Sequence, residues 1–119
     1  MNPILKILIV DDNQEMRRAI RQVVARSGDK IVECDDGKDA VAIYKKLKPD
    51  WVLMDLNLKS TDGIAATASI TASDPSAKVL IVTDYGDSLF RKAAKEAGAA
   101  NFILKENLFD IDTIIRKTP

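Results

Sequence analysis

The chain alternates short apolar runs with longer amphipathic segments, and the alternation repeats five times. The apolar runs are mostly rich in Val, Ile or Leu, which is typical of β-strands. They span residues 6–10, 30–34, 51–54, 78–82 and 101–104. Three of them are almost continuously apolar, as expected of central strands that are covered on both faces. The pattern therefore predicts a sheet with three buried strands.

The segments between these runs have the 3.6-residue period of helices with one buried face. The apolar faces consist, in chain order, of Met16, Ala19, Ile20, Val23 and Val24; Val41, Tyr44 and Leu47; Leu89, Ala93, Ala94 and Ala97; and Leu108, Ile111, Ile114 and Ile115. The segment 64–73 is rich in Ala and Thr and has the weakest helical pattern. Each predicted strand is thus followed by a predicted helix.

Five strand–helix units in succession predict an α/β fold. Right-handed crossovers between parallel strands place helices on both faces of the sheet. We therefore expect a (βα)5 doubly wound five-stranded parallel sheet with the flavodoxin-like strand order 2-1-3-4-5. The chain has no linker, repeat or low-complexity tract, so one domain is expected over residues 1–119. Ligands of such folds bind beyond the carboxyl ends of the strands.

Polar residues stand at those strand ends. They are Asp11 and Asp12 after the first strand, Asp55 after the third, Thr83 and Asp84 after the fourth, and Lys105 after the fifth. Two carboxylates about 4 Å apart repel by roughly 4 kcal/mol at an effective dielectric constant near 20, so a compensating cation is needed. Mg²⁺ suits a cluster of carboxylates, and Lys105 supplies a second, fixed positive charge.

Composition narrows the possible functions. The chain of 119 residues is 46% hydrophobic, and its 18 Lys and Arg balance 18 Asp and Glu. This balance gives no bulk attraction to nucleic acid or to an anionic membrane. The absence of histidine excludes Ser-His-Asp hydrolases and zinc sites with His ligands. The single cysteine, Cys34, and the lack of a long apolar run indicate a cytoplasmic protein without a membrane segment.

Two other ligand classes of this architecture do not fit. The loop after the first strand begins Asp11-Asp12, which would repel the phosphate of a flavin nucleotide unless a metal intervened. No glycine-rich phosphate-binding loop of the Rossmann or P-loop kind occurs. We therefore discard flavin and P-loop nucleotide binding.

Five segments together resemble the receiver domain of two-component response regulators. They are Ile-Leu-Ile-Val-Asp-Asp-Asn at 7–13, Pro-Asp-Trp-Val-Leu-Met-Asp-Leu-Asn-Leu at 49–58, Asp62-Gly63, Val82-Thr83, and Gly-Ala-Ala-Asn-Phe-Ile-Leu-Lys at 98–105. The resemblance covers essentially the whole chain. Its pattern is most similar to receivers that precede helix-turn-helix output domains.

The resemblance implies a role for each residue that matches a functional position of the family. Asp55 is the phosphoacceptor. Mg²⁺ is bound directly by Asp12, Asp55 and the backbone carbonyl of Asn57, and by Asp11 through water. Thr83 and Lys105 contact the phosphoryl group. Thr83 and Phe102 form the switch that changes with phosphorylation.

It also implies partners. The phosphodonor histidine belongs to a sensor histidine kinase or a phosphotransfer protein, so its absence here is no obstacle. The four arginines of the first helix, Arg17, Arg18, Arg21 and Arg26, are candidates for kinase docking. The signal passes through the face formed by the fourth helix, fifth strand and fifth helix to a target protein or to an output domain that binds DNA and controls transcription. Homodimerisation on phosphorylation is a further option. Such a protein is a switch and catalyses only its own phosphorylation and dephosphorylation.

Several positions depart from the family pattern and leave alternatives open. Lys59 replaces a usual proline, Asp84 replaces a small residue, and Phe102 replaces the common tyrosine. Asp84 is expected to slow phosphotransfer, and Asn57 and Tyr85 occupy positions that modulate dephosphorylation. One alternative is a pseudo-receiver that binds partners without being phosphorylated. Another is a Mg²⁺-dependent phosphohydrolase with an aspartyl-phosphate intermediate, although such enzymes commonly carry an acid where Asn57 stands.

Overall fold

The computed structural model describes residues 4–58 and 61–117. Its strands are β1 (Lys6–Val10), β2 (Lys30–Cys34), β3 (Trp51–Met54), β4 (Val79–Thr83) and β5 (Asn101–Leu104). They form one parallel sheet in the order β2-β1-β3-β4-β5, which confirms the predicted fold and strand order. The fourth strand lies one residue later than predicted. Thr83 therefore ends β4, where it pairs with Leu104.

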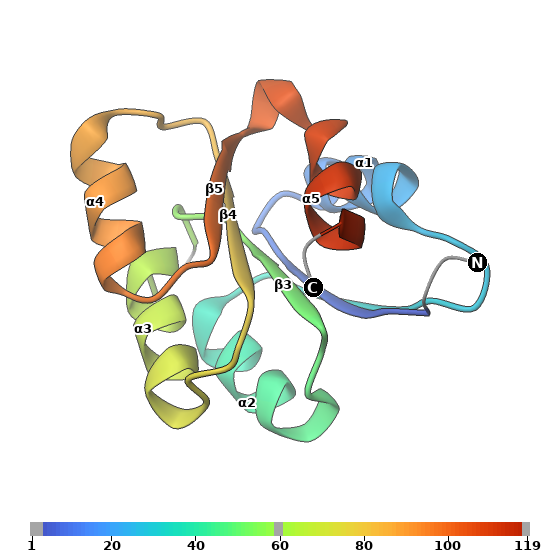
Figure 1. The fold of residues 1–119 in the computed structure, drawn as a ribbon, viewed down its shortest axis with the longest axis horizontal. Coiled ribbons are helices and arrows are strands. Elements are labelled where there is room, and N and C mark those ends of the chain that lie inside the picture. Colours follow the sequence, from blue (N-terminus) through green and yellow to red (C-terminus); the bar gives the residue numbers. More distant parts are fainter. Residues whose placement is uncertain (1–3, 59–60, 118–119) are drawn as a thin grey trace.

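The helices cover both faces of this sheet (Figure 1). They are α1 (Gln14–Val24), α2 (Gly37–Leu47), α3 (Gly63–Ser73), α4 (Ser88–Glu96) and α5 (Asp110–Lys117), with a short 3₁₀ turn, η1 (Lys105–Asn107), before α5. Helices α1 and α5 lie on one face, and α2, α3 and α4 lie on the other. The segment with the weakest helical pattern is nevertheless helical, because the Asp62 side chain accepts a hydrogen bond from Ala65 N and caps α3.

Alternate strand residues fill two separate cores. The core beneath α1 and α5 includes Ile7, Ile9, Leu53, Leu80 and Val82. The core beneath α2, α3 and α4 includes Leu8, Val10, Val52, Met54 and Ile81. This alternation is the two-residue period of a strand, and it explains why the central strands are apolar at nearly every position.

The predicted buried face of α4 is wrong at one residue. Leu89 was assigned to that face, but its side chain is 77% exposed. Ala94 is the residue of α4 that is fully buried, and Ala93 is half-buried. Leu89 lies in the first turn of α4, just after the N-cap Asp87. No helix in the described ranges combines the length and hydropathy needed to cross a bilayer.

Candidate functional site

Asp55 follows β3 at the carboxyl edge of the sheet and is only 3% exposed. Its backbone N–H donates to the Val10 carbonyl at 2.9 Å, which continues the β1–β3 ladder by one residue. On the other side, Gly63 packs against the Asp55 backbone so closely that a Cβ at position 63 would lie 2.0 Å from the Asp55 carbonyl oxygen. The start of α3 therefore fixes the position of Asp55 and requires glycine there.

Asp11 is the second buried acid of the site and is 1% exposed. Its Oδ1 accepts a hydrogen bond from Asn13 N at 2.9 Å. Its Oδ2 accepts no well-aligned hydrogen bond from any described residue. The charge of Asp11 is instead balanced by Lys105, whose Nζ lies 3.1 Å from Oδ2 as an ion pair.

Lys105 is shared between two acids. Its Nζ also lies 3.4 Å from Asp55 Oδ2, and its side chain is largely buried. Burial would lower the pKa of Lys105, but the two carboxylates outweigh that effect and raise it. One cation thus serves two buried anions, which leaves the site with an excess of negative charge.

This excess changes the ionisation of Asp55. Burial, followed by repulsion from Asp11, raises the pKa of Asp55 to about 6. Lys105 and a hydrogen bond from the Asn57 backbone act in the opposite direction without cancelling the shift. Burial and the neighbouring carboxylate destabilise the ionised form of Asp55 by more than the shared lysine stabilises it, so the protonated form gains.

Asp12 completes an acidic cluster. One carboxylate oxygen from each of Asp11, Asp12 and Asp55 lies within 4.8 Å of the others, and Asp12 is exposed to solvent. Carboxylate oxygens are the ligands of hard divalent cations. The Asp11 oxygen that lacks a hydrogen bond and the raised pKa of Asp55 both fit a site that accommodates an additional cation.

Thr83 lies at the end of β4 and is completely buried. Its Oγ1 accepts a hydrogen bond from the Tyr85 backbone N–H at 3.2 Å, so the hydroxyl oxygen is directed toward its own loop. Because Thr83 pairs with Leu104, it stands next to Lys105 across the end of the sheet. The structure therefore brings Thr83, Lys105, Asp11, Asp12 and Asp55 to one edge.

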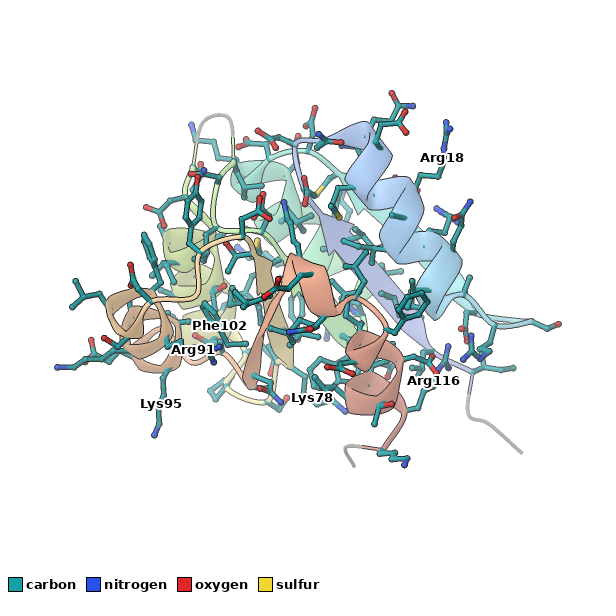
Figure 2. All side chains as sticks on the ribbon, turned by 90° about the horizontal axis from the view of Figure 1, so that it is seen from above. Arg18, Lys78, Arg91, Lys95, Phe102 and Arg116 are labelled. Atoms are coloured by element: carbon teal, nitrogen blue, oxygen red, sulfur yellow. The ribbon has the colours of Figure 1, made fainter. Side chains whose placement is uncertain are left out.

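Phe102 lies further down the neighbouring strand. It pairs with Ile81, which lies two residues before Thr83 on β4. The side chains of Phe102 and Thr83 therefore lie on the same face of the sheet. Its half-buried ring is covered by Arg91 of α4, whose guanidinium carbon lies 4.7 Å from the ring centroid. Figure 2 shows Arg91 beside the ring and Lys95 directed away from it.

The predicted modulating residues lie around the opening of the site. Asn57 Nδ2 donates to the Tyr85 hydroxyl at 3.1 Å and so joins the loop after β3 to the loop after β4. Asp84 is exposed, and its charge contributes to the raised pKa of Lys105. Lys59 lies outside the described residues.

Two features of the site were missed at the level of sequence. The first is the close approach of Gly63, although Asp62-Gly63 was among the segments that carried the resemblance. The second is Arg17, whose Nη1 donates to the Asp11 carbonyl at 2.6 Å and whose Nε pairs with Glu33. Arg21 also pairs with Glu33, and Arg26 pairs with Asp112. Three of the four arginines considered for docking are thus engaged within the molecule, whereas Arg18 extends from α1 into solvent (Figure 2).

Comparison with known proteins shows the family of the chain. The family model of the response regulator receiver domain matches residues 7–117. The chemotaxis protein CheY of Listeria monocytogenes is 39% identical over 112 residues, which cover 93% of this chain and 92% of CheY. The response regulator VraR of Staphylococcus aureus is 37% identical over 96% of this chain but only 56% of its own length. A LuxR-family response regulator from Aurantimonas sp. superimposes with a TM-score of 0.85 at 34% identity, covering 95% of this chain and 86% of that chain.

Proposed function

Because the chain belongs to the response regulator receiver family, we propose that it is a phosphorylation-dependent switch whose acceptor is Asp55. The observation that carries this assignment is the position of Asp55, which is buried beside Asp11 and Lys105 and has a pKa raised to about 6. Strongly perturbed carboxylates at the end of a strand are typical of reactive groups. Asp55 remains mostly ionised at neutral pH and is able to act as a nucleophile.

The proposed reaction transfers a phosphoryl group from a phosphohistidine of a sensor kinase or phosphotransfer protein. An Asp55 carboxylate oxygen attacks phosphorus in line, the phosphorus–nitrogen bond breaks, and the histidine nitrogen leaves with the electron pair. Lys105, already 3.4 Å from Asp55, neutralises charge on the transferred group. The product is an acyl phosphate on Asp55.

The acidic cluster suits Mg²⁺ in this proposal. Asp12, Asp55 and the backbone carbonyl of Asn57 would hold the ion directly, and Asp11 would hold it through water. When bound, Mg²⁺ would offset the negative charge that accumulates during transfer. The Asn57 side chain donates to the Tyr85 hydroxyl, so in this proposal the residue contributes its backbone carbonyl, and not its side chain, to the ion.

The same contacts support a route from Asp55 to the surface. Thr83 Oγ1 accepts a hydrogen bond from the Tyr85 backbone N–H in this structure, and its own hydroxyl hydrogen would be donated to phosphoryl oxygens on Asp55, drawing Thr83 toward them. A shift of Thr83 frees space on the face that it shares with Phe102. The ring of Phe102 has no hydroxyl, so its position depends on packing and on the covering Arg91. The proposed output is a rearrangement of the surface formed by α4, β5 and α5.

The proposed partners are a cytoplasmic sensor kinase and a target of the altered surface. The transcriptional regulatory protein DegU of Brevibacillus brevis is 32% identical over 93% of this chain but only 47% of its own length, which supports transcription control through an output domain as one form of target. A second phosphorylated copy of this chain, bound through the same surface, is another form of target in this proposal.

Labelling with acetyl phosphate tests the acceptor assignment. With Mg²⁺ present, the wild-type chain should gain the mass of one phosphoryl group, and Asp55→Asn should gain none. Asp110→Asn, an exposed aspartate in the first turn of α5, is the matched control and should be labelled like wild type. Labelling that persists in Asp55→Asn would contradict the proposal, and labelling without any divalent cation would contradict the proposed role of Mg²⁺.

Asp84 is proposed to slow this labelling. It lines a hollow of about 130 Å³ together with Lys105 and Glu106. Its negative charge therefore opposes the approach of an anionic phosphodonor. Asp84→Ala should increase the rate of labelling by acetyl phosphate, and an unchanged rate would remove Asp84 from the proposal.

A further inference from the structure

A groove of about 510 Å³ lies between α3 and α4 beside the acceptor site. Its walls are mostly apolar, with Ala65 and Ala68 on α3 and Phe90 and Ala93 on α4. Asn57 and Tyr85, which are joined by a hydrogen bond, line the end of the groove nearest Asp55. The groove is separate from the surface formed by α4, β5 and α5, because it lies on the opposite side of α4 from Arg91 and Phe102.

Exposed apolar side chains gather at this groove. Within the described ranges, five large hydrophobic residues are exposed; two of them, Tyr85 and Phe90, line the groove, and a third, Leu89, lies between them in the chain without lining it. The rings of Tyr85 and Phe90 contact each other with centroids 5.7 Å apart. An apolar cluster of this kind on a small protein is typical of an interaction surface.

The shape of the groove suits a helix. No residue from Gly63 to Ser73 is charged, and the exposed Ala65 and Ala68 extend no further than Cβ. Another helix can therefore approach α3 to the usual interaxial distance of about 8–10 Å. The 11 residues of α3 span about 16 Å, which matches about three turns of a bound helix.

The acidic side chains at one end of the groove indicate what charge a bound helix should carry there. Asp62 is the one charged side chain that lines the groove among the described residues, and it caps α3 near Asn57. Asp84 and Asp87, both exposed, follow in the adjacent loop. This end of the groove is therefore acidic, whereas the rest is uncharged.

We propose that the groove between α3 and α4 binds an amphipathic helical segment of a partner protein. The apolar stripe of that segment packs between Ala68 and Phe90, and a lysine or arginine at one end lies near Asp62. This is the helix-in-groove mode of recognition. The inference does not depend on phosphorylation of Asp55, so it is tested on the unphosphorylated chain.

A synthetic peptide provides the test. It is a helical peptide of about three turns, with leucines along one face and a lysine pair at one end. Calorimetry should detect binding, and amide NMR shifts should map to α3 and α4. Ala68→Glu should weaken binding by at least about tenfold, because a charged side chain then occupies the groove. Ala42→Glu makes the same change at an exposed helical alanine on α2 and should leave the affinity unchanged.

A second peptide with glutamates in place of the lysine pair should bind at least about threefold more weakly, the loss expected for an exposed charge pair. Equal affinities of the two peptides would overturn the choice of partner. Equal affinities of Ala68→Glu and Ala42→Glu, or amide shifts confined to other helices, would overturn the site. Self-association of the free chain that Ala68→Glu abolishes would assign the groove to a second copy instead.

Discussion

Each end of the sheet holds an aspartate whose side chain is enclosed next to a cation, Asp29 beside Arg116 and Asp55 beside Lys105, but the two sites are built in opposite ways. At the amino end, Asp29 Oδ1 accepts a hydrogen bond from Leu5 N, and Oδ2 accepts from Arg26 N and from Arg116. Burial would raise the pKa of Asp29, but these donors outweigh it and lower the pKa. At the carboxyl end, the pKa of Asp55 is raised to about 6.

The difference lies in the number of partners available to each acid. Arg116 donates to Asp29 and to the Val24 carbonyl and also contacts Asp112, so it joins α5 to the end of α1. Lys105 has to serve both Asp55 and Asp11. Asp29 is thus fully paired and contributes to stability, whereas the carboxyl end retains unbalanced charge. Proteins tolerate such an imbalance mainly where function requires it.

The largest expected effect comes from breaking the satisfied end. Arg116→Ala leaves the carboxylate of Asp29 buried without its cation, which should lower the free energy of unfolding by about 3 kcal/mol. Urea denaturation measures the change. Arg18→Ala is the control, because Arg18 extends into solvent (Figure 2), and it should change stability by less than about 0.5 kcal/mol. Similar losses in the two variants would contradict the role of Arg116.

A smaller loss is expected at Gly63. The new Cβ of Gly63→Ala would meet the backbone carbonyl of Asp55, which cannot move without displacing the acceptor. We expect a loss of about 2 kcal/mol and slower labelling of Asp55. At Gly86 a Cβ would meet only the end of the Leu104 side chain, at 2.7 Å, and a side chain is able to rotate away. Gly86→Ala should therefore be milder in both measurements, and an equal effect would exclude the proposed contact.

Relieving the charge at the carboxyl end should stabilise the protein. The pKa of Asp55 is higher in the folded chain, about 6, than in the unfolded chain, about 3.9. The folded state therefore binds the proton more tightly, so stability is lost as the pH rises from about 4 to about 6, and the full cost of the ionised carboxylate remains at higher pH. Without Mg²⁺, Asp55→Asn should raise the free energy of unfolding at pH 7 by about 1–2 kcal/mol. The gain should vanish below about pH 4.

Asp29 provides the opposite pH dependence. The pKa of Asp29 is lower in the folded chain than in the unfolded chain. The ionised carboxylate therefore adds to the free energy of unfolding above the unfolded pKa, and this stabilisation is lost as the pH falls through the folded pKa. Thermal denaturation from about pH 2 to about pH 8 separates the two groups, because stability tied to Asp29 is lost only below about pH 4, whereas stability tied to Asp55 is lost as the pH rises from about 4 to about 6. An Asp55→Asn variant that is less stable than wild type at pH 7 would contradict the account of the carboxyl end.

The sequence allowed the fold and the acceptor cluster to be predicted for a simple reason. The period-2 and period-3.6 patterns are local, and parallel strands bring their carboxyl ends to one edge whatever the details of packing. Contacts between distant side chains have no such pattern. Asp29 and Arg116 are 87 residues apart, and nothing local indicates that they meet. Leu89 was misplaced for a related reason, since helical periodicity marks one face of α4 but does not tell which turns of that face are covered by other elements.

The smallest expected effect concerns the link between the two loops above Asp55. Tyr85→Phe keeps the ring contact with Phe90 but removes the hydroxyl that accepts from Asn57. Both residues are exposed, so the loss of stability should stay below about 1 kcal/mol. We expect a larger effect on the acyl phosphate, because separating the loops admits water to Asp55. Its rate of hydrolysis, followed by the loss of label, should rise by about two- to fivefold.

A double-mutant cycle decides whether the link itself is responsible. Asn57→Ala removes the donor side chain and retains the backbone carbonyl proposed to bind Mg²⁺. If the hydrogen bond restrains the loops, Asn57→Ala and Tyr85→Phe should accelerate hydrolysis to a similar extent, and the double variant should be no faster than either single one. Multiplying effects would mean that the two residues act independently. The hydrogen bond between Asn57 and Tyr85 would then not be what restrains the loops, and each side chain would shield the acyl phosphate from water by itself.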